Sequence, residues 1–230
     1  MKIMKIFSLP IINIVIFAFN GLWCWLCGRL LSRSFISSQN QLHRNLADFF
    51  YSITVFFWLV VFASLALFFD QEAIRISFNL AALSLFIALA FFIKVPFAIK
   101  FPSFAQLAFW LIFILGVAAT FIDLYHASSS FSIIGGWIVW RRFLFLSPVF
   151  FAVSALVSLV STIFFSFGIF ISKSKNARYR SLLLTTASLL LTISTGFWIA
   201  ESYLFLNIAY ISAAVGYFLA YVGIVKKYSI

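Results

Sequence analysis

Long apolar stretches separated by short polar segments are the main pattern along this chain of 230 residues. A helix that crosses about 30 Å of hydrocarbon needs about 20 mostly apolar residues. Seven stretches of this kind contain no charged residue: Phe7–Gly28, Phe49–Phe69, Ile76–Ile93, Ser103–Ile122, Pro148–Ile171, Ser181–Ala200 and Phe205–Val225. Each of them therefore predicts a segment that spans a membrane.

The residues within these stretches favour helices over a barrel. Backbone groups in lipid must be hydrogen-bonded by other backbone groups, which leaves α-helices or closed β-barrels. Barrel strands alternate apolar and polar residues, whereas Phe50–Phe69 and Leu182–Ala200 show no such alternation. We expect an all-α integral membrane protein, with residues 1–230 forming one domain of seven transmembrane helices.

The composition excludes other classes of protein. Hydrophobic residues make up 65% of the chain and charged residues 9%, against about 45–50% and 25% in a soluble domain. So little polar material cannot cover a globule of this size, which excludes a soluble enzyme. A disordered chain is excluded as well, because disorder needs low hydrophobicity and high charge.

The formal net charge of +11 sets the expected orientation. With the N-terminus outside, the inner segments hold eleven basic residues and one acid, Asp48, and the outer segments hold five basic residues and four acids. Basic residues concentrate on the cytoplasmic side of membrane proteins. The C-terminus is therefore expected inside, in a multi-pass protein of a cell membrane, the bacterial cytoplasmic membrane. The positive charge then reflects topology, and no nucleic-acid partner is expected.

Three connections between the predicted helices have features of their own. The polar segment from Arg29 to Asp48 predicts a flexible inner loop. Pro96 and Pro102 predict a tight turn at the interface, because proline interrupts a helix.

Between the fourth and fifth helices, two β-prone runs flank Gly135-Gly136 and predict an outer hairpin over residues 131–140. This hairpin is either a lid over the outer mouth of the bundle or a plain interfacial plug.

Few residues carry recognisable chemistry. Cys24 and Cys27 have the spacing of a redox pair, but the predicted topology places them near the reducing cytoplasm, which favours helix packing. His43 and His126 fall on opposite sides of the membrane and cannot share a metal ion. We expect no catalytic residues, no metal, no cofactor and no enzymatic activity.

Polar residues at the outer helix ends form a candidate ligand pocket. Polar groups in a membrane bundle are costly and tend to be functional, so we expect these residues to bind a ligand. The members of the pocket are Arg75, Asp123, Arg141, Glu201 and Asn207. Ordinary interfacial anchoring is the alternative.

Three further stripes suggest helix packing through hydroxyl groups or small residues. They are Ser154, Ser158 and Ser161 on the fifth helix, Thr185, Ser188, Thr192 and Thr195 on the sixth, and Ala209, Ala213, Gly216, Ala220 and Gly223 on the seventh.

The C-terminal stretch from Ala213 to Ile230, with its Lys226-Lys227-Tyr228 end, and the basic segment Lys173–Arg180 resemble the seven-transmembrane N-terminal region of bacterial sensor histidine kinases. The resemblance is specific mainly over the last sixty or so residues. It implies an input module, and the chain ends at Ile230, where a family member continues into its signalling helix. No kinase part is present in this sequence.

The leading functional hypothesis is thus a membrane sensory module that relays an external or intramembrane signal to the cytoplasmic side. Its expected partners are the lipid bilayer and either a separate cytoplasmic signalling protein or a second copy of the chain. A small-molecule transporter is the alternative, although we find no inverted repeat or broken helix of the kind that transporters show. A membrane thiol redox protein acting through Cys24 and Cys27 is a weaker alternative.

Overall fold

The computed structural model describes the backbone of residues 2–66, 71–126, 130–134, 137–141, 146–198 and 203–225. It describes the side chains of residues 14–66, 72–125, 149–194 and 208–223. Seven helices and two strands lie in these ranges: α1 (Lys2–Ser38), α2 (Gln41–Ala66), α3 (Gln71–Lys100), α4 (Pro102–His126), β1 (Ser130–Ile134), β2 (Trp137–Arg141), α5 (Leu146–Ile171), α6 (Lys175–Trp198) and α7 (Tyr203–Val225). The prediction of a helical protein is confirmed.

Five of these helices, α1 to α5, are long and apolar enough to cross a membrane. The apolar part of α7 that is described, Ile208–Gly223, is shorter, and α6 begins with Lys175, Arg178 and Arg180. The coarse prediction of several membrane-type helices is therefore confirmed, and the count of seven spans stays a prediction.

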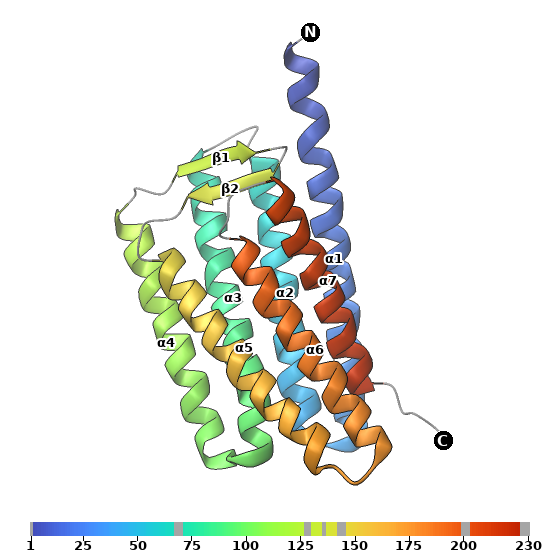
Figure 1. The fold of residues 1–230 in the computed structure, drawn as a ribbon. Helices are drawn as coiled ribbons and strands as arrows, with labels where there is room; N and C mark the ends of the chain where they lie inside the picture. Colours follow the sequence, from blue (N-terminus) through green and yellow to red (C-terminus); the bar gives the residue numbers. More distant parts are fainter. Residues whose placement is uncertain are drawn as a thin grey trace.

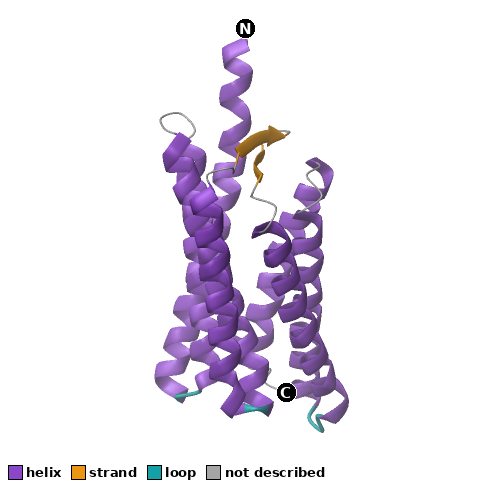
Figure 2. Cartoon of the chain, turned by 90° about the vertical axis from the view of Figure 1, so that its left-hand side faces the viewer, coloured by secondary structure: helices purple, strands orange, loops and turns teal. Residues whose placement is uncertain are grey.

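The helices run alternately up and down along one axis (Figures 1 and 2). The α1–α2, α3–α4 and α5–α6 turns lie at one end of the bundle together with the end of α7 at Val225, and we call this the turn end. The N-terminus of α1 and the two strands lie at the other, which we call the strand end. There β1 and β2 pair antiparallel, with Ser130 opposite Arg141; Gly135 and Gly136 lie outside the described residues.

The expectation of a flexible loop from Arg29 to Asp48 is wrong, because α1 and α2 continue through most of it. Gln39 takes a left-handed backbone conformation, φ 53°, and donates its N–H to the carbonyl of Phe35 at 2.7 Å, which closes α1. The Asn40 side chain then accepts the N–H of Leu42 at 2.9 Å, the bond of an N-cap residue. Two adjacent helix caps thus replace the loop.

The tight turn predicted from Pro96 and Pro102 is present next to Pro102, but the expected interruption of the helix at Pro96 is wrong. The helix α3 continues to Lys100 with Pro96 inside it, and Phe101 is the single residue between α3 and α4. Proline removes one backbone donor from a helix, and neighbouring helices can compensate for that loss in a bundle. Pro96 is fully buried, so its ring contributes to packing. Lys94 and Lys100 lie over the rings of Phe109 and Phe167, on α4 and α5.

The helices divide into two groups by the extent of their mutual contacts. The first group is α1 to α4 and the second is α5 to α7; within each, consecutive helices pack along their length, whereas contacts between the groups are far fewer. In Figure 1 the second group, yellow to red, lies in front of α1 to α3. We call the boundary between the groups the seam. Ring contacts cross it, for example between Phe86 and Phe150 and between Phe17 and Tyr210.

Candidate functional site

A cavity with about 90 Å³ of space for the centres of water-sized molecules lies on the seam. Its walls come from α2 and α3 of the first group and from α5, α6 and α7 of the second. Spaces between the helices of a bundle are common places for small-molecule sites. The cavity is therefore the first candidate for a functional site.

Aromatic rings make up much of the wall: Phe49, Phe56, Phe57, Phe92, Phe150, Tyr210 and Tyr217. The ring of Phe49 lies 5.1 Å from that of Phe92 and 6.2 Å from that of Tyr217, between centroids. Phe57 meets Tyr217 edge to face at 6.2 Å. Aromatic rings at these separations attract one another, so α2 faces α7 mainly through rings.

Serine hydroxyls supply part of the polar lining. Ser154 and Ser158 on α5 and Ser194 on α6 face the cavity. Ser154 is 1% exposed, and its Oγ has no hydrogen-bond partner among the described residues. Several other hydroxyls in the helices, such as those of Thr54, Ser64 and Ser212, donate to the carbonyl four residues earlier. The Ser154 hydroxyl is therefore buried at the cavity wall without a partner in the described part of the chain.

Charged groups are absent from the described lining of this cavity. A charged ligand buried without a counter-charge would lose several kcal/mol of hydration. The lining therefore favours uncharged molecules, held by ring and aliphatic contacts and oriented by a few hydroxyl groups.

The seventh helix borders the cavity on one side and packs closely on α6 on another. A Cβ placed on Gly216 would lie 3.3 Å from the backbone oxygen of Ala187, and one on Gly223 would lie 3.2 Å from the Cβ of Leu183. These glycines belong to the small-residue stripe predicted on α7. Small residues let helices approach closely, and Gly216 and Gly223 bring α7 against α6. Ala209 and Ala213 of the same stripe line the cavity.

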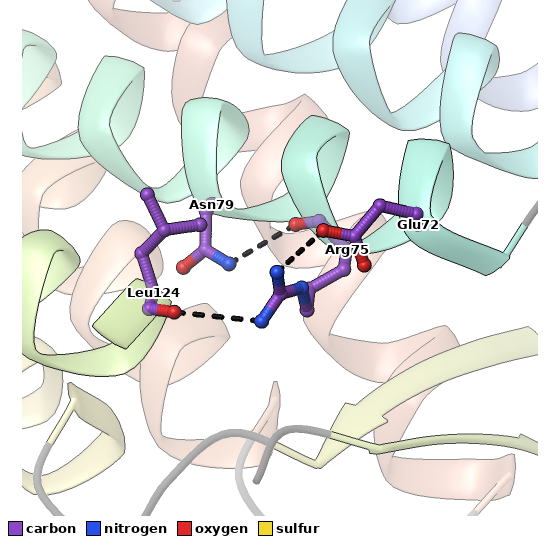
Figure 3. Close-up of polar contacts among 4 residues, drawn as sticks. All are labelled: Glu72, Arg75, Asn79 and Leu124. Carbon is purple, nitrogen blue, oxygen red and sulfur yellow. Dashed lines mark hydrogen bonds and ion pairs between the residues drawn. The ribbon is translucent and has the colours of Figure 1, made fainter. Parts of the chain in front are cut away.

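Two members of the predicted outer pocket, Arg75 and Asp123, lie at the strand end of α3 and α4, and Figure 3 shows the polar contacts around Arg75. Arg75 pairs with Glu72 on its own helix and donates from Nη1 to the carbonyl of Leu124 on α4 at 3.4 Å. Asn79 donates to the Arg75 carbonyl at 3.0 Å. Asp123, next to Leu124, is fully buried.

Two of the five predicted pocket residues, Arg75 and Asp123, thus lie near each other at the α3–α4 contact. The side chains of Arg141, Glu201 and Asn207 lie outside the described residues. Glu72 was not among the predicted site residues, although its spacing of three from Arg75 on a helix is a known signal for an ion pair.

Cys24 and Cys27 are free thiols, both buried in α1. His43 accepts or donates at Nδ1 with the hydroxyls of Ser34 and Ser38, both at 3.1 Å, across the α1–α2 turn. His126 ends α4 at the strand end, the opposite end of the bundle from His43. Over the described residues, no group of three or more His, Cys, Asp or Glu residues is placed to hold a metal ion.

The chain matches no protein-family model, and no curated protein matches it in sequence.

Proposed function

We propose that this protein is a membrane-embedded sensory module, in which a small molecule enters the seam and changes how α7 sits against the first helix group. The observation that carries the proposal is the position of the cavity. It lies between two helix groups that contact each other far less than their own helices do. A ligand there touches both groups at once, and it shifts their arrangement if it binds one arrangement more tightly than the other.

The second part of the proposal concerns the path of the signal. Close contacts at Gly216 and Gly223 tie α7 to α6, whereas α7 faces α2 through rings at the cavity. Motion of the second group is thus passed along α7 to Val225 at the turn end. A cytoplasmic signalling protein, or a second copy of the chain, is the proposed receiver. The resemblance to the input regions of sensor histidine kinases agrees with this role.

The third part is the membrane topology: seven spans, the N-terminus outside and the C-terminus in the cytoplasm. Large apolar side chains such as Phe104, Leu111, Ile114 and Phe121 are exposed along α4, where lipid would cover them. The turn end carries Arg33, Arg44, Lys100 and other basic residues, which supports its placement inside. On this topology the two strands lie over the outer end of the bundle, as a lid.

Disulfide trapping tests whether α7 moves. Trp23 on α1 and Phe218 on α7, whose rings lie 6.1 Å apart across the seam and which are not part of the described cavity lining, are both changed to cysteine in a background with Cys24→Ala and Cys27→Ala. We expect the cross-linking rate to change when a cavity ligand is added. The control pair, Leu183→Cys with Gly223→Cys, joins α6 to α7, where the Cβ atoms lie 3.2 Å apart, and its rate should stay constant. Equal rates with and without a bound ligand in both pairs would contradict the proposal.

A reporter that is active only outside the cell tests the topology. Fused after Ile230 it should be inactive, and inserted between α4 and β1 it should be active. The reverse result would overturn the orientation, although the cavity and its seam would be unaffected.

A further inference from the structure

The chemistry of the seam cavity also specifies the kind of molecule that fits it. We infer that the cavity binds an uncharged, ring-bearing lipophile dissolved in the bilayer, with one hydroxyl or carbonyl oxygen that bonds to Ser154. This inference deepens the proposed function and rests on it for its role in signalling. Three features of the cavity carry it: the rings, the lack of charge in the described lining, and the hydroxyl of Ser154.

The rings specify a flat apolar body. Phe49, Phe92 and Tyr217 lie at centroid distances of 5.1 and 6.2 Å around one part of the cavity, and Phe150 closes it from α5. These rings already contact one another, so a ligand ring would join the cluster from the cavity side, through the offset or edge-to-face contacts that aromatic groups prefer. A ring system inserted here touches α2, α3, α5 and α7 together.

The charge of the lining specifies neutrality. The described residues around the cavity offer no cation to a carboxylate or phosphate and no anion to an amine. An anionic analogue of the same shape would have to leave its hydration shell without compensation. A neutral lipophile has no such cost, and it reaches mid-bundle depth from the lipid because it partitions into the bilayer.

The Ser154 hydroxyl specifies one polar atom on the ligand. Ser154 lies at the cavity wall, it is almost completely buried, and its Oγ is unpartnered in the described part of the chain. A buried hydroxyl that lacks a partner is costly. A change of the Ser154 χ1 rotamer that turns Oγ toward the cavity lets a ligand oxygen accept its proton and removes that cost. Ser161, two turns further along α5, offers a matched comparison: it is equally buried and also unpartnered among the described residues, yet it is not part of the cavity lining.

The test uses three naphthalene derivatives and the full chain in lipid nanodiscs. Binding is read by the displacement of the fluorescent probe 1-aminoanthracene, with empty nanodiscs as the blank. We expect 1-naphthol to bind more tightly than naphthalene by about fivefold, the effect of one net hydrogen bond. The carboxylate 1-naphthoate should bind at least tenfold more weakly than 1-naphthol, because its charge is uncompensated. Equal affinity for all three compounds would overturn the inference.

Substitutions locate the bound molecule. Ser154→Ala should lower the affinity for 1-naphthol to that for naphthalene and leave naphthalene binding unchanged, whereas Ser161→Ala should change neither. Ala213→Leu and, separately, Ala88→Leu place extra atoms in the cavity from α7 and α3 and should weaken both compounds. Circular dichroism identifies the variants that keep their helical content. Unchanged 1-naphthol affinity in a folded Ala213→Leu or Ala88→Leu protein, or equal effects of Ser154→Ala and Ser161→Ala, would contradict the assignment.

The two proposals fail in different ways. Specific binding of 1-naphthol with no change in the Trp23–Phe218 cross-linking rate removes the sensory function and leaves the ligand site. A change in cross-linking caused by another compound, without specific 1-naphthol binding, removes the inferred ligand class and leaves the sensory function.

Discussion

Two contacts of α7 differ in kind: one is closely packed, and the other lies beside a cavity. Toward α6, α7 presents Gly216 and Gly223, and an added Cβ would touch the neighbouring helix within 3.3 Å. Toward α2, across the seam, it presents Tyr217 to rings about 6 Å away beside an open cavity. Packing without voids tolerates little change, whereas a contact beside a cavity can be rearranged at lower cost. On the proposed function, α6 and α7 move together, and the motion occurs at the seam.

The largest expected effect comes from forcing the α6–α7 contact apart. Gly216→Leu places a side chain against the Ala187 carbonyl and Leu191, and we expect it to lower the free energy of unfolding by about 3 kcal/mol. Denaturation in mixed micelles with increasing SDS measures this value. The adjacent Val215 is exposed, so Val215→Leu serves as the control and should change it by less than about 0.5 kcal/mol. Equal effects of the two substitutions would show that this contact is not tight.

A second close contact within a helix group tests whether tightness is general there. A Cβ on Gly116 of α4 would lie 2.3 Å from the Cβ of Phe86 on α3. We therefore expect Gly116→Ala to cost about 2 kcal/mol in the same assay, since one of the two helices must shift. An unchanged free energy would mean that α4 moves freely on α3, and the division into rigid groups would fail.

The same enlargement on the cavity side should cost little. Ala213 lies one turn before Gly216 and lines the cavity, so Ala213→Leu has room for its added atoms. We expect a change of less than about 1 kcal/mol in the free energy of unfolding, combined with weakened binding of 1-naphthol. A loss as large as that of Gly216→Leu would show that the two contacts of α7 are alike.

The smallest effect is expected at the strand end. Arg75 and Glu72 form an ion pair one turn apart on α3, with Glu72 more than half exposed. Glu72→Gln should lower the free energy of unfolding by less than about 1 kcal/mol, and the loss should shrink at high salt, because exposed ion pairs are screened. A larger loss that persists in high salt would show that the pair holds α3 and α4 together.

The apolar pattern predicted the helices well and their ends poorly. The lipid-crossing length is visible in the sequence because charged residues are absent from it. The ends of the helices are not visible in the sequence, because each end depends on one capping residue. Gln39 ends α1 in a left-handed conformation that favours glycine, and Asn40 caps the start of α2. Pro96 was read as a stop, but burial among neighbouring helices keeps α3 intact.

The candidate site was harder to predict than the helices. Ser154, Ser158 and Ala213 were all visible as members of one-sided stripes, and the sequence offered no way to separate a stripe that packs on a helix from one that borders a cavity. That distinction depends on which helices are neighbours. Arg75 and Asp123 could be placed at the same end from the alternation of spans, because antiparallel helices bring the start of α3 beside the end of α4.

The measurement that tests the central claim most directly is the distance between spin labels on the two helix groups. Val55 on α2, Leu189 on α6 and Val215 on α7 are exposed, so each can carry a label in the background without Cys24 and Cys27. On addition of 1-naphthol in nanodiscs, we predict that the Val55–Val215 distance across the seam changes by about 1–2 Å or more, while the Leu189–Val215 distance within the second group stays the same. Two unchanged distances with 1-naphthol bound, or a change confined to the Leu189–Val215 pair, would contradict the account.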